Sequence, residues 1–219
     1  MIKGILPPTV AVAAVDHDPA GAELFPEEEA AVIHAEGKRY REFATVRWCA
    51  RRAMAQLKVS PAPIVRGKNG APAWPAGIVG SMTHCEGYRA AAVASTHNIT
   101  TLGIDAEVHE AIPKGVLKSI ACDEELSCLR TLNSIRPDIH WDRLMFSAKE
   151  SVYKAWFPIT KKWLGFRDAV IVISQDGTFT ARLLPSDSPF DQLDGRWAVE
   201  EGLVATSVVV PASSAEQSC

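Results

Sequence analysis

Apolar and polar residues alternate along this chain with two different periods, which predict different elements. Residues 25–57 are apolar in part, acidic at their start and basic later, and they predict one or two helices. A short helix is expected near residues 122–132. A further helix is predicted over residues 142–157, because at 3.6 residues per turn one of its faces is apolar, formed by Leu144, Ala148, Val152, Ala155 and Trp156.

Short apolar runs bounded by turn residues predict the strands. The first is "TVAVAAV", residues 9–15, and two more, 88–95 and 99–107, are expected to pair as a hairpin across "THN". Two later hairpins are predicted to turn at Asp176-Gly177 and at Glu201-Gly202. Residues 60–80 are dense in Pro and Gly and predict a loop that continues into "GSMTHC", residues 80–85.

The order of these elements predicts the fold class. A helix followed by antiparallel strands occurs once in each half of the chain, which indicates an α+β fold of two similar lobes, related by a pseudo-twofold axis. We expect an N-terminal lobe over residues 1–107, a C-terminal lobe over 108–210 and a flexible tail over 211–219. Clefts between lobes commonly bind ligands, so the shared cleft is the expected site.

Composition narrows the class of protein. Of the 219 residues, 47% are hydrophobic and 22% charged, which is ordinary for a globular protein, and the net charge of −3 argues against a dedicated nucleic-acid binder. The five cysteines form no CxxC pair and fit no zinc spacing, so we expect reduced thiols and a cytoplasmic protein. Pro7 and Pro8 interrupt the N-terminal apolar run, and no 18-residue apolar run predicts a membrane span.

The segment "GIDAEV" places two carboxylates at the end of an apolar strand. Asp105 and Glu107 are two residues apart and therefore leave the same face of the strand. Adjacent carboxylates repel unless a cation lies between them, and Mg²⁺ is the candidate because it prefers carboxylate, water and phosphate oxygens. The alternative is an exposed strand end with two solvated acids.

Three further groups of polar residues could bind an anion. The predicted helix of residues 142–157 carries Lys149, Glu150 and Lys154 outside its apolar face, although Glu150 and Lys154 also suit a solvated ion pair. In "GSMTHC", Ser81, Thr83 and His84 offer hydroxyls and an imidazole beside a glycine. The early helical region is basic through the residues Arg39, Arg47, Arg51 and Arg52, which suit either a solvated face or a phosphate site.

Five motifs in order resemble those of the phosphopantetheinyl transferases of the surfactin and enterobactin-synthetase type. They are "KRYREFATVRWCARRAM", "PIVRGKNGAPAWP", "GSMTHC", "GIDAE" and "FSAKESVYKAW", and the resemblance runs from about residue 37 to residue 167. The last two resemble the signature of the family, with Phe146 where many members have Trp and Ser151 where Ala is common. Neither difference affects a charged position.

The resemblance implies a fold, an activity and roles for individual residues. It implies transfer of the 4′-phosphopantetheine arm of coenzyme A to a serine of an apo acyl or peptidyl carrier protein, by a monomer of the holo-[acyl-carrier-protein] synthase type. Asp105, Glu107 and Glu150 would hold Mg²⁺, and Glu150 would also be the base. The implied coenzyme A contacts are Lys149 and Lys154 to the phosphates, Arg39, Arg47 and His84 to the 3′-phosphate, and Arg66, Lys68 and Thr83 in the nucleotide pocket.

Two other interpretations remain at this point. A Mg²⁺-dependent nuclease or phosphodiesterase also uses acids together with a Glu and a Lys, but such sites place these two residues two apart on a strand. Here Lys149 and Glu150 are adjacent in a predicted helix. A noncatalytic nucleotide-binding module would keep the same charged residues.

Overall fold

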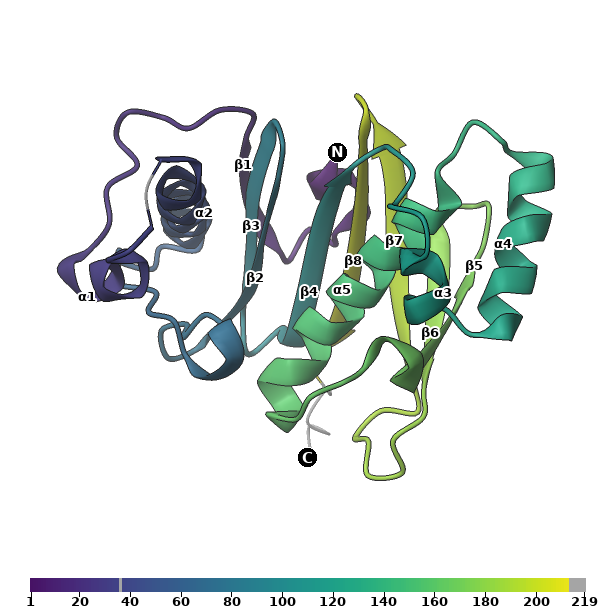
Figure 1. The fold of residues 1–219 in the computed structure, drawn as a ribbon. Helices are drawn as coiled ribbons and strands as arrows, with labels where there is room; N and C mark the ends of the chain where they lie inside the picture. Colours follow the sequence, from purple (N-terminus) through teal and green to yellow (C-terminus); the bar gives the residue numbers. More distant parts are fainter. Residues whose placement is uncertain (36, 213–219) are drawn as a thin grey trace, which may run out of the picture.

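The computed structural model describes residues 1–35 and 37–212, and for Lys68 it describes the main chain alone. The expected C-terminal tail therefore lies outside the described residues from residue 213 onward. The structure confirms the α+β class: two antiparallel sheets stand side by side, and each is covered by a 20-residue helix (Figure 1). None of the helices in the described part combines the length and apolarity needed to cross a membrane.

The N-terminal lobe is a three-stranded sheet covered by one long helix. Its strands are β1 (Ala11–Val15), β2 (Ile78–Cys85) and β3 (Tyr88–Ser95), in the order β1-β3-β2. Helix α2 (Gly37–Gln56) packs on this sheet through a face of small and medium apolar residues, which are Cys49, Ala50, Ala53 and Met54. Short helical turns complete the lobe, namely α1 (Pro26–Glu29), η2 (Ala30–Val32) and η3 (Lys68–Gly70), whereas η1 (Ile2–Ile5) packs against the sheet of the C-terminal lobe.

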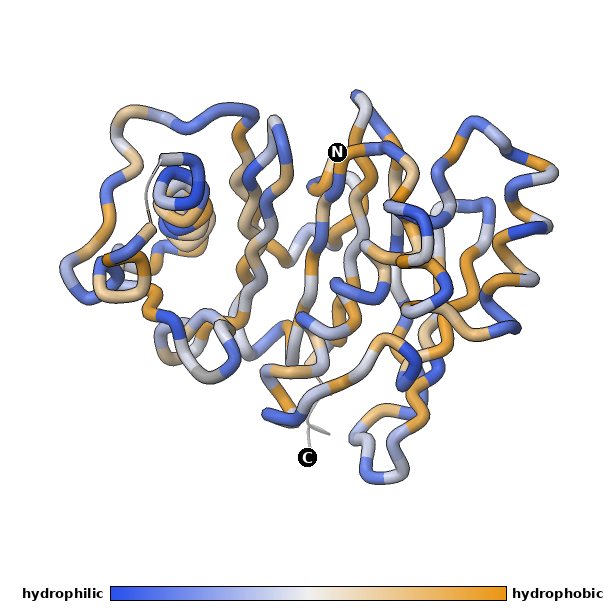
Figure 2. The backbone as a smooth tube through the Cα atoms, viewed as in Figure 1, coloured by the Kyte–Doolittle hydropathy of each residue, from blue (hydrophilic) through white to orange (hydrophobic). Residues whose placement is uncertain are grey.

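The C-terminal lobe is a five-stranded sheet with the order β4-β8-β7-β6-β5. Its strands are β4 (Ile99–Val108), β5 (Ala169–Ile173), β6 (Thr178–Leu183), β7 (Gln192–Glu200) and β8 (Leu203–Pro211). Its helices are α3 (Val116–Ile120), α4 (Asp123–Ile135) and α5 (Trp141–Thr160), followed by the turn η4 (Phe166–Asp168). The five apolar residues predicted for α5 are all buried, and hydrophilic and hydrophobic positions alternate along the turns of α2 and α4 in Figure 2.

Two of the three expected hairpins are confirmed, and one is wrong. β5 pairs with β6 and β7 with β8, and Gly177, Glu201 and Gly202 have the positive φ that tight hairpin turns require. The strand 88–95 instead pairs with β2, because "GSMTHC" is part of that strand and not of a loop. β4 pairs with β8, so sheet membership changes between Ser95 and Ile99 and not after residue 107.

The two sheets meet through β2 and β4, which do not pair as one continuous sheet. Instead, the Ser81 hydroxyl accepts a hydrogen bond from the Ile104 N–H at 3.1 Å, and the Thr83 hydroxyl accepts one from the Ala106 N–H at 3.0 Å. On the other side of this junction, η1 buries Ile2 against residues of both lobes. This junction fixes the position of β4 relative to β2, and the candidate site lies beside it.

Candidate active site

Helix α5 lies unusually close to β4, and this approach places its polar residues beside the strand. A Cβ atom at Gly103 would be 2.0 Å from the carbonyl oxygen of Ser151, so only glycine allows this packing. Two residues further along the strand, the Asp105 carboxylate pairs with the Lys154 ammonium at 2.7 Å. Lys154 also donates to the Ile104 carbonyl at 3.1 Å, which leaves one of its three donors for a ligand.

Asp105 is held in place from the N-terminal lobe as well. The Thr83 hydroxyl lies 3.2 Å from Oδ1 of Asp105, and both residues are buried. Oδ2 of Asp105 is buried without a hydrogen-bond partner among the described residues. A buried carboxylate oxygen with no donor is costly, so this atom fits a bound cation.

The other two carboxylates share this electrostatic environment. Burial raises the pKa of Glu150, and the Asp105 charge adds to this effect, while Lys154 opposes it. Burial and the Asp105 charge also raise the pKa of Glu107, whose carboxylate pairs with Arg143 at 3.0 Å. A bound divalent cation would stabilise the charged carboxylates and so lower the pKa values of Glu150 and Glu107 again. This also fits a metal at Asp105 and Glu150. Within residues 1–35 and 37–212, however, no three His, Cys, Asp or Glu side chains already stand at metal-site spacing.

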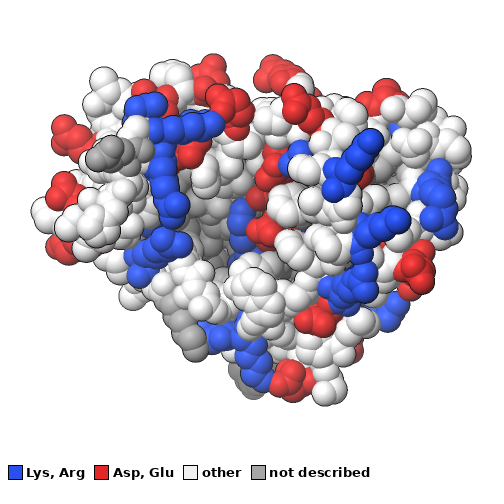
Figure 3. Space-filling model, in the orientation of Figure 1, with Lys and Arg blue, Asp and Glu red and all other residues white. Residues whose placement is uncertain are grey.

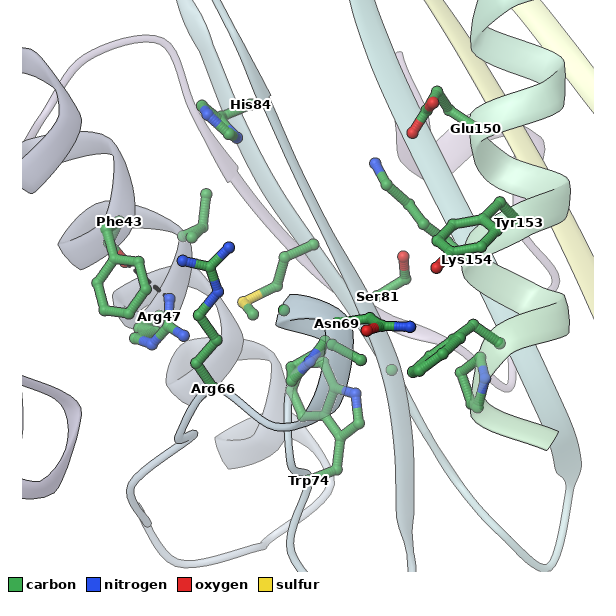
Figure 4. Close-up of a pocket in the computed structure, with 18 of the residues that line it drawn as sticks. Phe43, Arg47, Arg66, Asn69, Trp74, Ser81, His84, Glu150, Tyr153 and Lys154 are labelled. Atoms are coloured by element: carbon green, nitrogen blue, oxygen red, sulfur yellow. Dashed lines mark hydrogen bonds between the residues drawn. The ribbon is translucent and has the colours of Figure 1, made fainter. Parts of the chain in front are cut away.

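A cavity of about 600 Å³ opens between α2, β2 and α5. Figure 3 shows the corresponding hollow, with Lys and Arg side chains along its left side and Asp and Glu side chains at its right. In Figure 4, Arg47, Arg66 and His84 lie on the N-terminal-lobe side, opposite Glu150 and Lys154 on α5. The cavity thus joins a cationic wall from one lobe to a mixed carboxylate and ammonium site from the other.

Arg47 is the buried member of the cationic wall. Its Nε donates to the Ile64 carbonyl at 2.9 Å, and its guanidinium lies 3.3 Å from the centre of the Phe43 ring. Burial lowers the pKa of Arg47 to about 10, and the nearby Glu28 carboxylate opposes this shift, so the side chain stays charged at neutral pH. These contacts fix a positive charge in a wall of low polarity, where an anion would interact strongly with it.

The other polar residues of the wall are more exposed. Arg39 and Arg66 are exposed residues at its surface, and Nε2 of His84 lies 3.6 Å from the Glu42 carboxylate. Desolvation lowers the pKa of His84, although Glu42 acts in the opposite direction. All the sequence-predicted 3′-phosphate residues therefore border one cavity.

The structure places several predicted residues elsewhere. Lys149 does not face the cavity with Lys154: its ammonium is buried against the Glu125 carboxylate at 2.7 Å and the Ala169 carbonyl at 2.8 Å. Thr83 supports Asp105 and does not line the cavity, and Glu107 is engaged by Arg143. The side chain of Lys68 lies outside the described residues.

The prediction missed other residues that line the cavity. On α2, Glu42 and Phe43 follow Arg39 at three and four residues, so helical spacing from Arg39 would have indicated them. Trp74 lies within a quoted motif, and Tyr153 is three residues beyond Glu150. These residues could be read from the sequence, but the sequence did not show which face of each helix borders the cavity. Cavity-lining residues could therefore not be distinguished from core residues.

This geometry defines an α+β protein of two lobes with a cleft suited to a ligand that carries several phosphates. Comparison with known proteins agrees with this class. Residues 27–94 match the model of the 4′-phosphopantetheinyl transferase N-terminal domain, and residues 101–207 match that of the 4′-phosphopantetheinyl transferase superfamily. The gap between the two matches contains the change from β3 to β4, where the chain passes from one sheet to the other.

Similar curated proteins come from three organisms. The 4′-phosphopantetheinyl transferase Svp of Streptomyces mobaraensis is 51% identical over 203 residues, which cover 89% of this chain and 82% of its own. PptT of Mycobacterium tuberculosis is 45% identical, covering 96% and 98%, and Npt of Nocardia iowensis is 42% identical, covering 95% and 99%. The chain therefore belongs to the 4′-phosphopantetheinyl transferase superfamily.

Proposed function

We propose that the protein transfers the 4′-phosphopantetheine arm of coenzyme A to a serine hydroxyl of an apo carrier protein, releasing 3′,5′-ADP. One observation carries this proposal. A single cavity is lined both by Arg39, Arg47 and His84 and by Glu150 and Lys154 of α5. Coenzyme A has a 3′-phosphate at one end of its nucleotide and a diphosphate at the other. This cavity offers a cationic region for the first, and for the second an ammonium beside carboxylates that could bind a metal.

In the proposed reaction, the serine oxygen attacks the β-phosphorus of coenzyme A. The bond from that phosphorus to the oxygen bridging to the α-phosphate breaks, and this oxygen leaves with 3′,5′-ADP. Phosphoryl transfer requires mainly positioning and neutralisation of charge on phosphate oxygens. Lys154 also contacts Asp105 and the Ile104 carbonyl, and its remaining N–H would donate a hydrogen bond to the diphosphate.

Glu150 is the proposed acceptor for the serine proton. Its side chain lines the cavity beside Lys154, so its carboxylate can lie within hydrogen-bond reach of an incoming serine hydroxyl. Mg²⁺ held by Asp105 and Glu150 would neutralise charge on the diphosphate oxygens when it is bound. The buried Oδ2 of Asp105, which has no hydrogen-bond partner in the part of the chain that the structure describes, supports this choice of ligand.

The roles of the other residues follow their positions. Arg47 and His84, with Arg39 at the surface, would bind the 3′-phosphate, and Arg66 would face the nucleotide. Glu107 would act through its pair with Arg143, next to the metal site. The burial of Lys149 against Glu125 supports a role in positioning α5 and not in phosphate contact.

Finer aspects of the function are part of the proposal. We infer an enzyme of the holo-[acyl-carrier-protein] synthase type that acts as a monomer in the cytoplasm on acyl or peptidyl carrier proteins, without a nucleic-acid partner. The net charge of −3 supports the last point. The four described cysteines, which are Cys49, Cys85, Cys122 and Cys128, are free thiols, which is compatible with a reducing compartment.

The test is direct transfer in vitro. The protein is incubated with coenzyme A, Mg²⁺ and several apo carrier proteins, and intact-mass measurement should show the gain of one phosphopantetheine on at least one carrier. Glu150→Gln and EDTA-treated wild type should show no gain. Failure of every carrier with folded wild type would refute the transfer, and full activity after EDTA treatment would refute the metal.

A further inference from the structure

Arg143, in the first turn of α5, binds the end of β4 and the chain after it through three nitrogens at once. Its Nη1 donates to Oε2 of Glu107 at 3.0 Å, its Nε to the Glu110 carbonyl at 3.0 Å and its Nη2 to the Ala111 carbonyl at 3.3 Å. A planar guanidinium held at three corners has little freedom to rotate. Arg143 therefore keeps the Glu107 side chain and the main chain after β4 in one arrangement.

This contact uses only one of the two oxygens of Glu107. Among the described residues, the one hydrogen-bond donor to its carboxylate is Arg143, and this donor takes Oε2. With Oε2 held, the direction of Oε1 is held as well, because a carboxylate is planar. Asp105 leaves the same face of β4, and its buried Oδ2 has no hydrogen-bond partner in the described part of the chain. Two carboxylate oxygens without donors thus stand on one face of the strand, which suits a hard cation.

The spacing along α5 places this contact beside the candidate metal site. Arg143 precedes Glu150 by seven residues, which is about two turns, so both side chains leave the same face of the helix. Lys154 follows Glu150 by four residues on that face and pairs with Asp105 at 2.7 Å (Figure 4). Each carboxylate of β4 is therefore paired with one cation of α5, and Glu150 lies between these two cations along the helix.

The two cations of α5 differ in what they can contribute to a bound metal. Lys154 lines the cavity and keeps a donor for a ligand. Arg143 is not among the residues that line the cavity, and its three contacts are all with the protein. A positive charge near a metal is unfavourable by itself, so Arg143 can favour metal binding only by orienting a ligand. Outer partners that orient a ligating carboxylate typically account for about 10–100-fold in metal affinity.

We propose that Arg143 is a positioning residue of the metal site: by holding Oε2 of Glu107, it presents Oε1 to the coordination shell of the divalent cation that Asp105 and Glu150 would hold. This inference rests on the proposed function, which supplies the cation. It gives Glu107 a part in metal binding in spite of its ion pair, because the ion pair occupies the other oxygen.

The test measures the binding of Mn²⁺ alone by electron paramagnetic resonance of the free ion, since Mn²⁺ prefers the same oxygen ligands as Mg²⁺. Arg143→Met removes the guanidinium and should weaken Mn²⁺ binding about 10–100-fold relative to wild type. Arg143→Lys can still hold Oε2 through a single ammonium and should recover part of this loss. Arg182→Met is the matched control, because the pair of Arg182 with Glu124 is exposed and lies outside the cavity lining, and it should bind Mn²⁺ as wild type does.

A double-mutant cycle with Glu107→Gln separates positioning from a general disturbance of the structure. Glu107→Gln alone should weaken Mn²⁺ binding, because an amide is a poor ligand. Adding Arg143→Met should weaken it no further, because Arg143 acts through the carboxylate that is already absent. If Arg143→Met does not fold, the cycle is run with Arg143→Lys, whose smaller loss should again disappear in the Glu107→Gln background.

Three results would overturn the inference. The first is an Arg143→Met protein, or an Arg143→Lys protein where that variant replaces it, that binds Mn²⁺ as tightly as wild type or more tightly. The second is an equal loss with and without Glu107→Gln. The third is a wild type that transfers phosphopantetheine but binds no Mn²⁺, which refutes the metal as well. In all three cases transfer by wild type stands, whereas a folded wild type that modifies no carrier refutes the proposed function itself.

Discussion

The buried pair of Lys149 and Glu125 allows the role of the first lysine of the motif to be decided experimentally. The Lys149 ammonium has three acceptors, which are the Glu125 carboxylate and the carbonyls of Phe166 and Ala169. The side chains of Lys149 and Glu125 are both 1% exposed, so water cannot replace these contacts. Lys149 thus ties α5 to α4 and to the start of β5.

Replacing Lys149 by Met removes the charge but keeps the length of the side chain. The Glu125 carboxylate then stays buried, and its remaining partners among the described residues are the N–H groups of Ile171 and Cys122. Breaking a buried ion pair from one side typically costs about 3–5 kcal/mol. For a chain of this size each kcal/mol lowers the Tm by about 2–4 °C, so Lys149→Met should lower the Tm by about 6–20 °C.

The double variant Lys149→Met/Glu125→Gln separates the charge effect from packing. It removes the unpaired charge and should therefore be more stable than Lys149→Met alone. Both variants should bind 3′,5′-ADP within about three-fold of wild type at a temperature where they are folded, a change of less than 1 kcal/mol.

Lys154→Met, the same substitution at the cavity, should lose affinity for coenzyme A. Thermal unfolding and calorimetry check these outcomes. A Lys149→Met protein with the wild-type Tm and strongly reduced nucleotide affinity would refute the positioning role and restore the phosphate contact.

Three further predictions follow from the site. Gly103→Ala should destabilise the protein by about 1–3 kcal/mol and reduce transfer, because the added Cβ displaces α5 from Asp105. Urea unfolding measures the loss of stability, and the transfer assay measures the loss of activity. Wild type should bind dephospho-coenzyme A about one to two decades more weakly than coenzyme A. Calorimetry should show a smaller difference between these two affinities in Arg47→Ala. An equal difference in the variant would place the 3′-phosphate elsewhere. Burial raises the pKa of Glu150 in the native state, so the native protein binds more protons than the unfolded chain between the two pKa values, and wild-type stability falls as pH rises through that window. Glu150→Gln should lack this fall, so its stability relative to wild type, measured in urea, should be greater at about pH 8 than at about pH 5.

The sequence predicted the elements well wherever a local pattern determines them. The apolar face of α5 follows from spacing alone, and the hairpin turns follow from residues such as Gly177 that tolerate positive φ. The partner of β4 was not predictable in this way. Its residues are buried along most of its length, so no polar face indicates which neighbour it has. The prediction assumed that the nearest strand in sequence was the partner, and long-range pairing with β8 proved to determine the sheet.

The two lysines of α5 show where prediction from sequence ends within the site. Lys149 and Lys154 are five residues apart, which corresponds to a rotation of about 140° around the helix, so they point in clearly different directions. Spacing alone therefore excludes a shared contact close to the helix, but it cannot say which lysine faces the ligand. That depends on a carboxylate from α4, Glu125, which also accepts the N–H of Ile171 at the edge of the sheet. Since β5 is an edge strand, its unpaired N–H requires an acceptor, and the acidic residue that meets this requirement also fixes Lys149. The role of Lys149 is thus decided by Glu125, the residue that accepts the unpaired N–H of the edge strand β5.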